Sequence, residues 1–134
     1  MNGKAPRLWH PQRVRALWLL CLLAACRDGS TKPTPADIVD RGWRAHEVVI
    51  RAGEREPTCA AAGIAMQRAF TEHRQAFVDA IALDSDRARL AEATAYLEQH
   101  ERRYGDLETR MTALSERCGD EPTVAAVYRW MESP

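Results

Sequence analysis

Three histidines, His46, His73 and His100, are the side chains of this sequence best placed to do chemistry. Each falls near the centre of the apolar stripe of an expected helix. A buried imidazole must form a hydrogen bond, bind a metal, or cost about 1–3 kcal/mol while unsatisfied. Burial should also lower the pKa of all three. Three roles are therefore open: hydrogen-bonded core residues, a metal or haem site, and a pH-sensing pair.

The spacing of the histidines along the chain limits which of them can meet. In an antiparallel hairpin of residues 57–83 and 86–118, His73 and His100 lie within about one helical turn of each other in height. His46 is expected near the level of Ile64, about 13 Å along the axis from His73. The sequence therefore predicts no site of three histidines and leaves His73 and His100 as the candidate metal pair.

Tyr104 and Glu101 are the oxygen ligands that such a pair would find nearby. The simpler interpretation is that Tyr104 hydrogen-bonds His73, while His46 and His100 bond to backbone or water. No nucleophile elbow, phosphate loop, paired zinc motif or haem-attachment motif is present. We therefore expect no enzyme and no cofactor, and keep a metal- or haem-binding bundle as the alternative.

The stretch from Leu17 to Cys26 decides how the cysteines are interpreted. Residues 1–16 carry four basic side chains and no acid, and residues 17–25 are uncharged and rich in leucine. A basic start, a short apolar core and small residues before a cleavage point are typical of a secretory signal. The apolar core is too short for a spanning helix, which needs about 20 apolar residues.

The sequence Leu23-Ala24-Ala25-Cys26 resembles the lipobox of bacterial lipoproteins. The resemblance covers only residues 1–26 and implies no activity. It implies that residues 1–25 are a cleaved signal peptide and that Cys26 carries lipid in the bacterial cell envelope. Residues 26–33 would then be the lipidated cysteine and a polar tether, and residues 34–134 a single helical domain.

Removal of residues 1–25 would leave 109 residues with 15 basic and 19 acidic side chains, a net charge of −4. This mildly acidic composition has no basic patch that would suggest a nucleic-acid partner. It would also leave Cys59 and Cys118 as an even pair in an oxidising compartment, which favours a disulfide. Two buried free thiols are the alternative.

The pattern of apolar residues predicts four helices and no strand. Thr34 and Pro35 begin the first, which should stop at Gly53. The second covers residues 57–83, and alanines along one flank would let a neighbouring helix come close. Apolar residues at spacings of three and four predict a continuous third helix over 86–118, with ion pairs Glu98–Arg102 and Asp106–Arg110. A short helix follows Pro122.

Short connections between these helices favour an all-α fold, a small antiparallel three-helix up-down-up bundle with a short fourth C-terminal helix. With no catalytic motif, we expect a non-catalytic module that contacts the membrane through lipid on Cys26 and binds an envelope protein or a wall component. The alternative is a periplasmic metal- or haem-binding bundle that uses His73 and His100.

Overall fold

The structure, a computed structural model, describes residues 32–134. The expected signal peptide (residues 1–25), the lipidation site Cys26 and most of the tether lie outside the described residues. Residues 33–134 form one compact unit. This part of the chain contains helices and no strand, which confirms the all-α prediction. None of the helices in residues 32–134 is long and apolar enough to cross a membrane.

Helix α2 (Pro35–Glu54) begins as the sequence predicts. The Thr34 hydroxyl accepts a hydrogen bond from the Asp37 backbone N–H at 3.1 Å, and the Asp37 carboxylate accepts one from the Thr34 backbone N–H at 3.1 Å. This reciprocal capping box satisfies N–H groups that the first turn leaves without partners. Pro35 occupies a first-turn position, where a missing N–H costs nothing.

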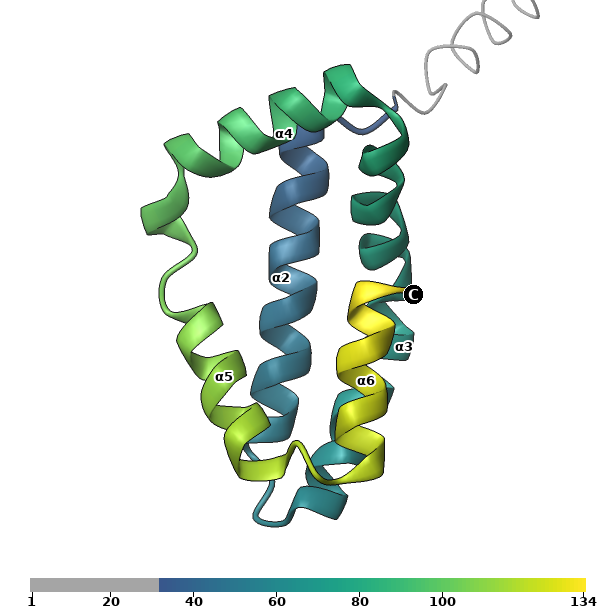
Figure 1. Ribbon diagram of the computed structural model, residues 1–134, viewed down its shortest axis with the longest axis vertical. Coiled ribbons are helices and arrows are strands. Elements are labelled where there is room, and N and C mark those ends of the chain that lie inside the picture. Colours follow the sequence, from purple (N-terminus) through teal and green to yellow (C-terminus); the bar gives the residue numbers. More distant parts are fainter. Residues whose placement is uncertain (1–31) are drawn as a thin grey trace, which may run out of the picture. The chain divides into compact units, whose positions relative to one another are not determined.

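Helix α3 (Cys59–Ala82) runs antiparallel beside α2 (Figure 1). Gly42 of α2 lies against Ala80: a Cβ added to Gly42 would stand 3.6 Å from the Ala80 Cβ. The alanine flank thus permits the close approach that the sequence predicts. The His46 ring meets Phe77, with centroids 4.6 Å apart. His46 is therefore level with Phe77, and its predicted position near Ile64 is wrong. The reason is that α3 starts beyond the end of α2: Gly53, at the end of α2, already lies against Met66, seven residues into α3.

The predicted continuous helix over 86–118 is wrong, because the chain breaks in the middle of this range. Helix α4 (Arg87–Gln99) is followed by a short 3-10 turn (Glu101–Arg103) and then by α5 (Leu107–Cys118). Gly105 between them has φ of +62°, a left-handed conformation that glycine adopts without a steric cost. The apolar repeat is buried in α5, at Leu107, Leu114 and Cys118, but Leu90 and Leu97 of α4 are 37% and 38% exposed.

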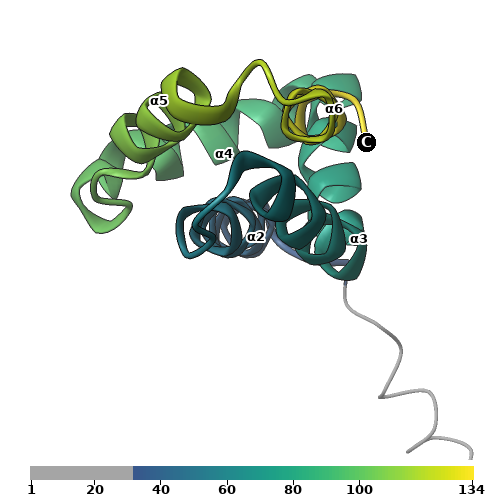
Figure 2. The same ribbon diagram turned by 90° about the horizontal axis from the view of Figure 1, so that it is seen from below.

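This break changes the arrangement of the bundle. Helix α4 crosses the end of α2, and α5 returns along the side of α2 away from α3 (Figure 1). Helix α6 (Pro122–Glu132) packs on α3. Viewed end-on, α2 and α3 form one layer, and α5 and α6 lie above them in a second (Figure 2). The structure does not confirm the three-helix up-down-up arrangement.

The main core lies between these two layers. Its fully buried side chains come from three helices, α2, α3 and α6: Val49, Ile50, Met66, Phe77, Val124 and Val127. Gly53 contributes by lacking a side chain, since a Cβ there would lie 2.7 Å from the Met66 sulfur and 2.9 Å from Leu114. The glycine predicted to stop the first helix therefore serves instead to let α3 and α5 close on α2.

The predicted disulfide between Cys59 and Cys118 is present, with an S–S distance of 2.06 Å and Cα atoms 5.2 Å apart. Cys59 begins α3 and Cys118 ends α5. The break after α4 lets α5 turn back toward the start of α3, so the bond does not require one straight hairpin. The disulfide therefore joins the two layers at the end of the domain opposite α4 (Figure 1).

Candidate functional site

The three histidines lie in different surroundings. His46 is half-buried on α2, its Nδ1 lies 2.8 Å from the Gly42 carbonyl oxygen, and its ring packs on Phe77. Burial of the ring lowers the pKa of His46 below its usual value, and the bond to the Gly42 carbonyl opposes this only in part. The prediction of a lowered pKa is confirmed for His46.

The prediction that His73 is buried is wrong, because its side chain is exposed. Phe70 and Phe77, on the same stripe of α3, are buried. On this face of α3, α6 ends at Glu132, and Trp130 in its last turn contacts Phe70 at a ring centroid distance of 5.8 Å, one turn before His73. The stripe is therefore uncovered at His73, although its apolar neighbours are shielded.

His100 follows the last turn of α4, half-buried, with Nδ1 2.8 Å from the Tyr96 carbonyl oxygen. Its ring stacks on Tyr96 at a centroid distance of 4.2 Å. The end of α4 that carries His100 and the middle of α3 that carries His73 lie on opposite sides of α2 in Figure 1. No group of three histidine, cysteine or acidic side chains within residues 32–134 is arranged to hold a metal ion.

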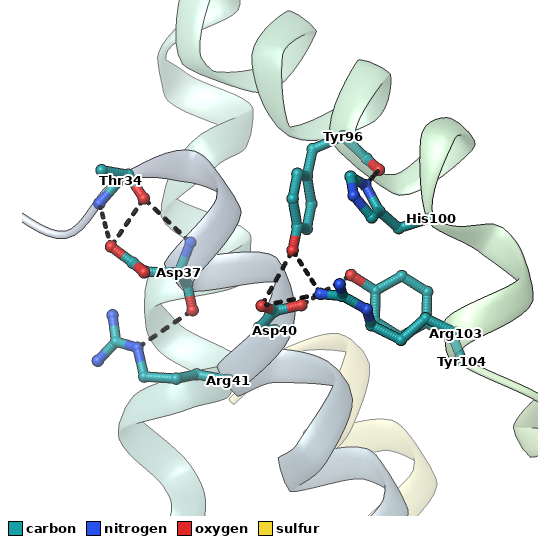
Figure 3. A network of polar contacts seen from close by, with 8 residues as sticks. All are labelled: Thr34, Asp37, Asp40, Arg41, Tyr96, His100, Arg103 and Tyr104. Atoms are coloured by element: carbon teal, nitrogen blue, oxygen red, sulfur yellow. Dashed lines mark hydrogen bonds and ion pairs between the residues drawn. The ribbon is translucent and has the colours of Figure 1, made fainter.

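Tyr104 binds Asp40 instead of the expected His73 (Figure 3). The Tyr104 hydroxyl donates to Asp40 Oδ1 at 2.9 Å, and the Tyr96 hydroxyl donates to Oδ2 at 3.0 Å. Arg103 Nη1 lies 3.8 Å from Asp40 Oδ2 and donates to the Tyr96 hydroxyl at 3.0 Å. Burial, followed by the bond to Asp40, raises the pKa of Tyr104. This network holds the segment between α4 and α5 against α2.

Next to this network is a cleft of about 370 Å³, which we call the acidic cleft. Trp43 of α2 and Tyr104 form part of its wall, with ring centroids 4.5 Å apart. Its remaining lining residues come from the end of α4, the break and the start of α5: Leu97, Glu98, Glu101, Gly105 and Glu108. The cleft thus combines an aromatic and aliphatic wall with three carboxylates.

The three glutamates of the acidic cleft are exposed, and within residues 32–134 none of their carboxylates forms a hydrogen bond or an ion pair. The predicted pair Glu98–Arg102 does not form, because α4 ends at Gln99 and the helical spacing of four is lost. The predicted pair Asp106–Arg110 is present at 4.0 Å.

Other carboxylates nearby do have arginine partners. Arg110 of α5 binds Glu54 of α2 through two hydrogen bonds, at 2.9 and 2.7 Å, and lies 3.9 Å from Glu47. These bonds lower the pKa of Glu54. Arg117 donates to the Gly53 carbonyl at 3.1 Å, at the end of α2. Arginines of α5 thus tie this helix to α2 and leave the acidic cleft without a basic group of its own.

Sequence reasoning missed the acidic cleft. It named Glu101 only as a metal ligand and Glu98 only as half of an ion pair. The one signal that could have located it is Gly105, a glycine inside an apparently regular helix, which is a common site of a break. Comparison with known proteins adds nothing to this assignment, since no protein-family model, no curated protein and no solved structure matches the chain.

Proposed function

We propose that this protein is a non-catalytic helical binding module, anchored in the bacterial cell envelope through lipid on Cys26. The observation that carries the proposal is the run Leu23-Ala24-Ala25-Cys26 after a basic start and a short apolar core. Residues 34–134 would then stand outside the bilayer on a short polar tether, facing an envelope protein or a wall component.

The Cys59–Cys118 disulfide supports the proposed location. Disulfides persist in the bacterial periplasm and on cell surfaces and are rare in the reducing cytosol. The bond joins the start of α3 to the end of α5, so the helical domain contains a bond that is typical of exported proteins. The two observations come from separate parts of the chain and point to the same compartment.

A binding role is favoured over catalysis because the described side chains of suitable chemistry do not converge. His46 packs on Phe77, His73 faces solvent and His100 stacks on Tyr96. The metal- or haem-binding alternative, which requires His73 and His100 to meet, gains no support from these positions. The acidic cleft, with a volume of about 370 Å³, is large enough to receive a small ligand.

Replacement of Cys26 tests the anchor. Cys26→Ser, expressed in a bacterial host supplied with labelled palmitate, should accumulate as uncleaved precursor without label, because the serine hydroxyl replaces the thiol that would be lipidated. The matched control is Cys21→Ser, which removes a thiol from the same stretch and should leave labelling and cleavage unchanged. Equal labelling of wild type and Cys26→Ser would refute the anchor.

A further inference from the structure

We propose that the acidic cleft binds a linear aliphatic polyamine, a chain of methylenes that carries two or more ammonium groups. The inference rests on the proposed function only in treating the domain as a binding module. It requires neither the anchor nor a particular membrane. It names the chemical class of a ligand and the residues that would hold it.

The size of the cleft suits a small molecule. At about 370 Å³ it falls in the range of small-molecule sites, roughly 300–1,000 Å³. Such sites are mostly apolar with a few polar groups that fix the ligand. Leu97, which is 38% exposed, contributes apolar surface to the lining of the cleft. A chain of methylenes would cover this surface.

The charge of the cleft selects a cation. Glu98, Glu101 and Glu108 come from the end of α4, the break and α5, so three separate segments bring carboxylates to one opening. Arginine side chains pair with Asp40, Glu47, Glu54 and Asp106, but within residues 32–134 none pairs with these three. Carboxylates spread around an apolar wall match ammonium groups that are separated by methylenes.

The aromatic wall adds a second attraction for cations. An ammonium group over the face of a tryptophan is stabilised by the negative charge of the ring face. Trp43 is half-buried against Tyr104, and the Tyr104 hydroxyl is fixed by Asp40 at 2.9 Å. The wall is therefore ordered before a ligand arrives, which reduces the entropy lost on binding. At Gly105 no atom lies within 4 Å of an added Cβ, so this side of the cleft is open.

Calorimetric titration of the full chain, purified in detergent, with spermidine tests the proposal. The triple variant Glu98→Gln/Glu101→Gln/Glu108→Gln should weaken binding about tenfold, the expected sum of three partly exposed ion pairs. The matched control is Glu72→Gln/Glu92→Gln/Glu132→Gln, which removes the same charge from exposed positions outside the cleft. It should change the Kd less than about twofold. Circular dichroism checks that both variants keep their helices.

Three results would overturn the proposal. The first is no heat of binding between wild type and spermidine at low salt. The second is equal weakening by the two triple variants, which would mean attraction to overall negative charge. The third is butylamine, a monoamine, binding as tightly as spermidine, which would exclude recognition of separated ammonium groups. Both triple variants retain Cys26, so palmitate labelling reports on the anchor separately.

Discussion

At the scale of single residues, burial separates three histidines that the sequence treats alike. All three occupy equivalent positions on apolar stripes, yet His46 is half-buried, with its pKa lowered by burial, whereas His73 is exposed. Its ring is held between α2 and Phe77, where the charged form loses its hydration. His73 lies one turn beyond Phe70, which contacts Trp130 in the last turn of α6, and its side chain is exposed. The pH response expected of a buried imidazole therefore belongs to His46.

We predict that His46 makes the domain less stable in mild acid. A histidine with a lowered folded pKa binds fewer protons folded than unfolded, so its contribution is full above the unfolded pKa of about 6.5 and falls as the pH drops below it. His46→Leu, which keeps an apolar contact with Phe77, should reduce the fall in melting temperature between about pH 7.5 and 5.5.

The exposed His73 provides the control for this measurement. His73→Leu should leave the pH dependence of the melting temperature unchanged, because its side chain stays in water. If His46→Leu retains the full dependence of the wild type, His46 is not its source.

At the scale of helices, packing depends on where side chains are absent. Gly42 and Gly63 both lie in helix interiors, where glycine costs roughly 0.5–1 kcal/mol relative to alanine. Only at Gly63 do the neighbouring residues leave no room for a side chain. A Cβ on Gly63 would lie 2.7 Å from the Thr123 Cβ and 3.3 Å from the Val124 backbone nitrogen, at the start of α6. A Cβ on Gly42 would make an ordinary contact with Ala80 at 3.6 Å.

We therefore expect alanine to have opposite effects on the stability of the domain at the two positions. Gly63→Ala should destabilise the domain by about 1–3 kcal/mol, because the start of α6 must move away from α3. Gly42→Ala should be neutral or stabilising by up to about 1 kcal/mol, since it gains helix propensity without a clash. Urea unfolding followed by circular dichroism measures both. Equal effects of the two substitutions would contradict the close approach of α6 to Gly63.

At the scale of the whole molecule, the disulfide and the Asp40 network fix opposite ends of α5. The Cys59–Cys118 bond joins α3 to the end of α5. At the other end, Tyr96 and Tyr104 fix α4 and the break to α2 through Asp40. Between these two points, Arg110 pairs with Glu54. The acidic cleft is thus built on a segment that is fixed on both sides.

Loss of the disulfide should lower the free energy of unfolding by about 4 kcal/mol, because the bond closes a loop of 59 residues in the unfolded chain. Cys59→Ala, Cys118→Ala and the double variant should be about equally destabilised, since either single change removes the bond. Urea unfolding without reductant measures the three variants.

Thiol counting gives an independent check. In a Cys21→Ser/Cys26→Ser background only Cys59 and Cys118 remain, and the denatured, non-reduced protein should contain no reactive thiol. Two reactive thiols would contradict the disulfide.

The helical class, the helix start at Thr34 and Pro35 and the pairing of Cys59 with Cys118 were all predicted from the sequence alone. The helical class depends on the spacing of apolar residues, and the helix start depends on the residue types at two adjacent positions. The disulfide depends on two cysteines being left to pair. The export signal is likewise a property of one continuous stretch, so it can be proposed from residues 1–26 without a structure.

Only the tertiary structure decided which apolar stripes are covered and where the third predicted helix breaks. Leu90, Leu97 and Tyr104 share one helical repeat, but Tyr104 reaches Asp40 from the break that follows α4. The exposure of His73 depends on where α6 ends. The acidic cleft depends on the break between α4 and α5, which brings the end of α4, the break itself and the start of α5 together. Periodicity describes one helix at a time, whereas burial depends on the partner that packs against it.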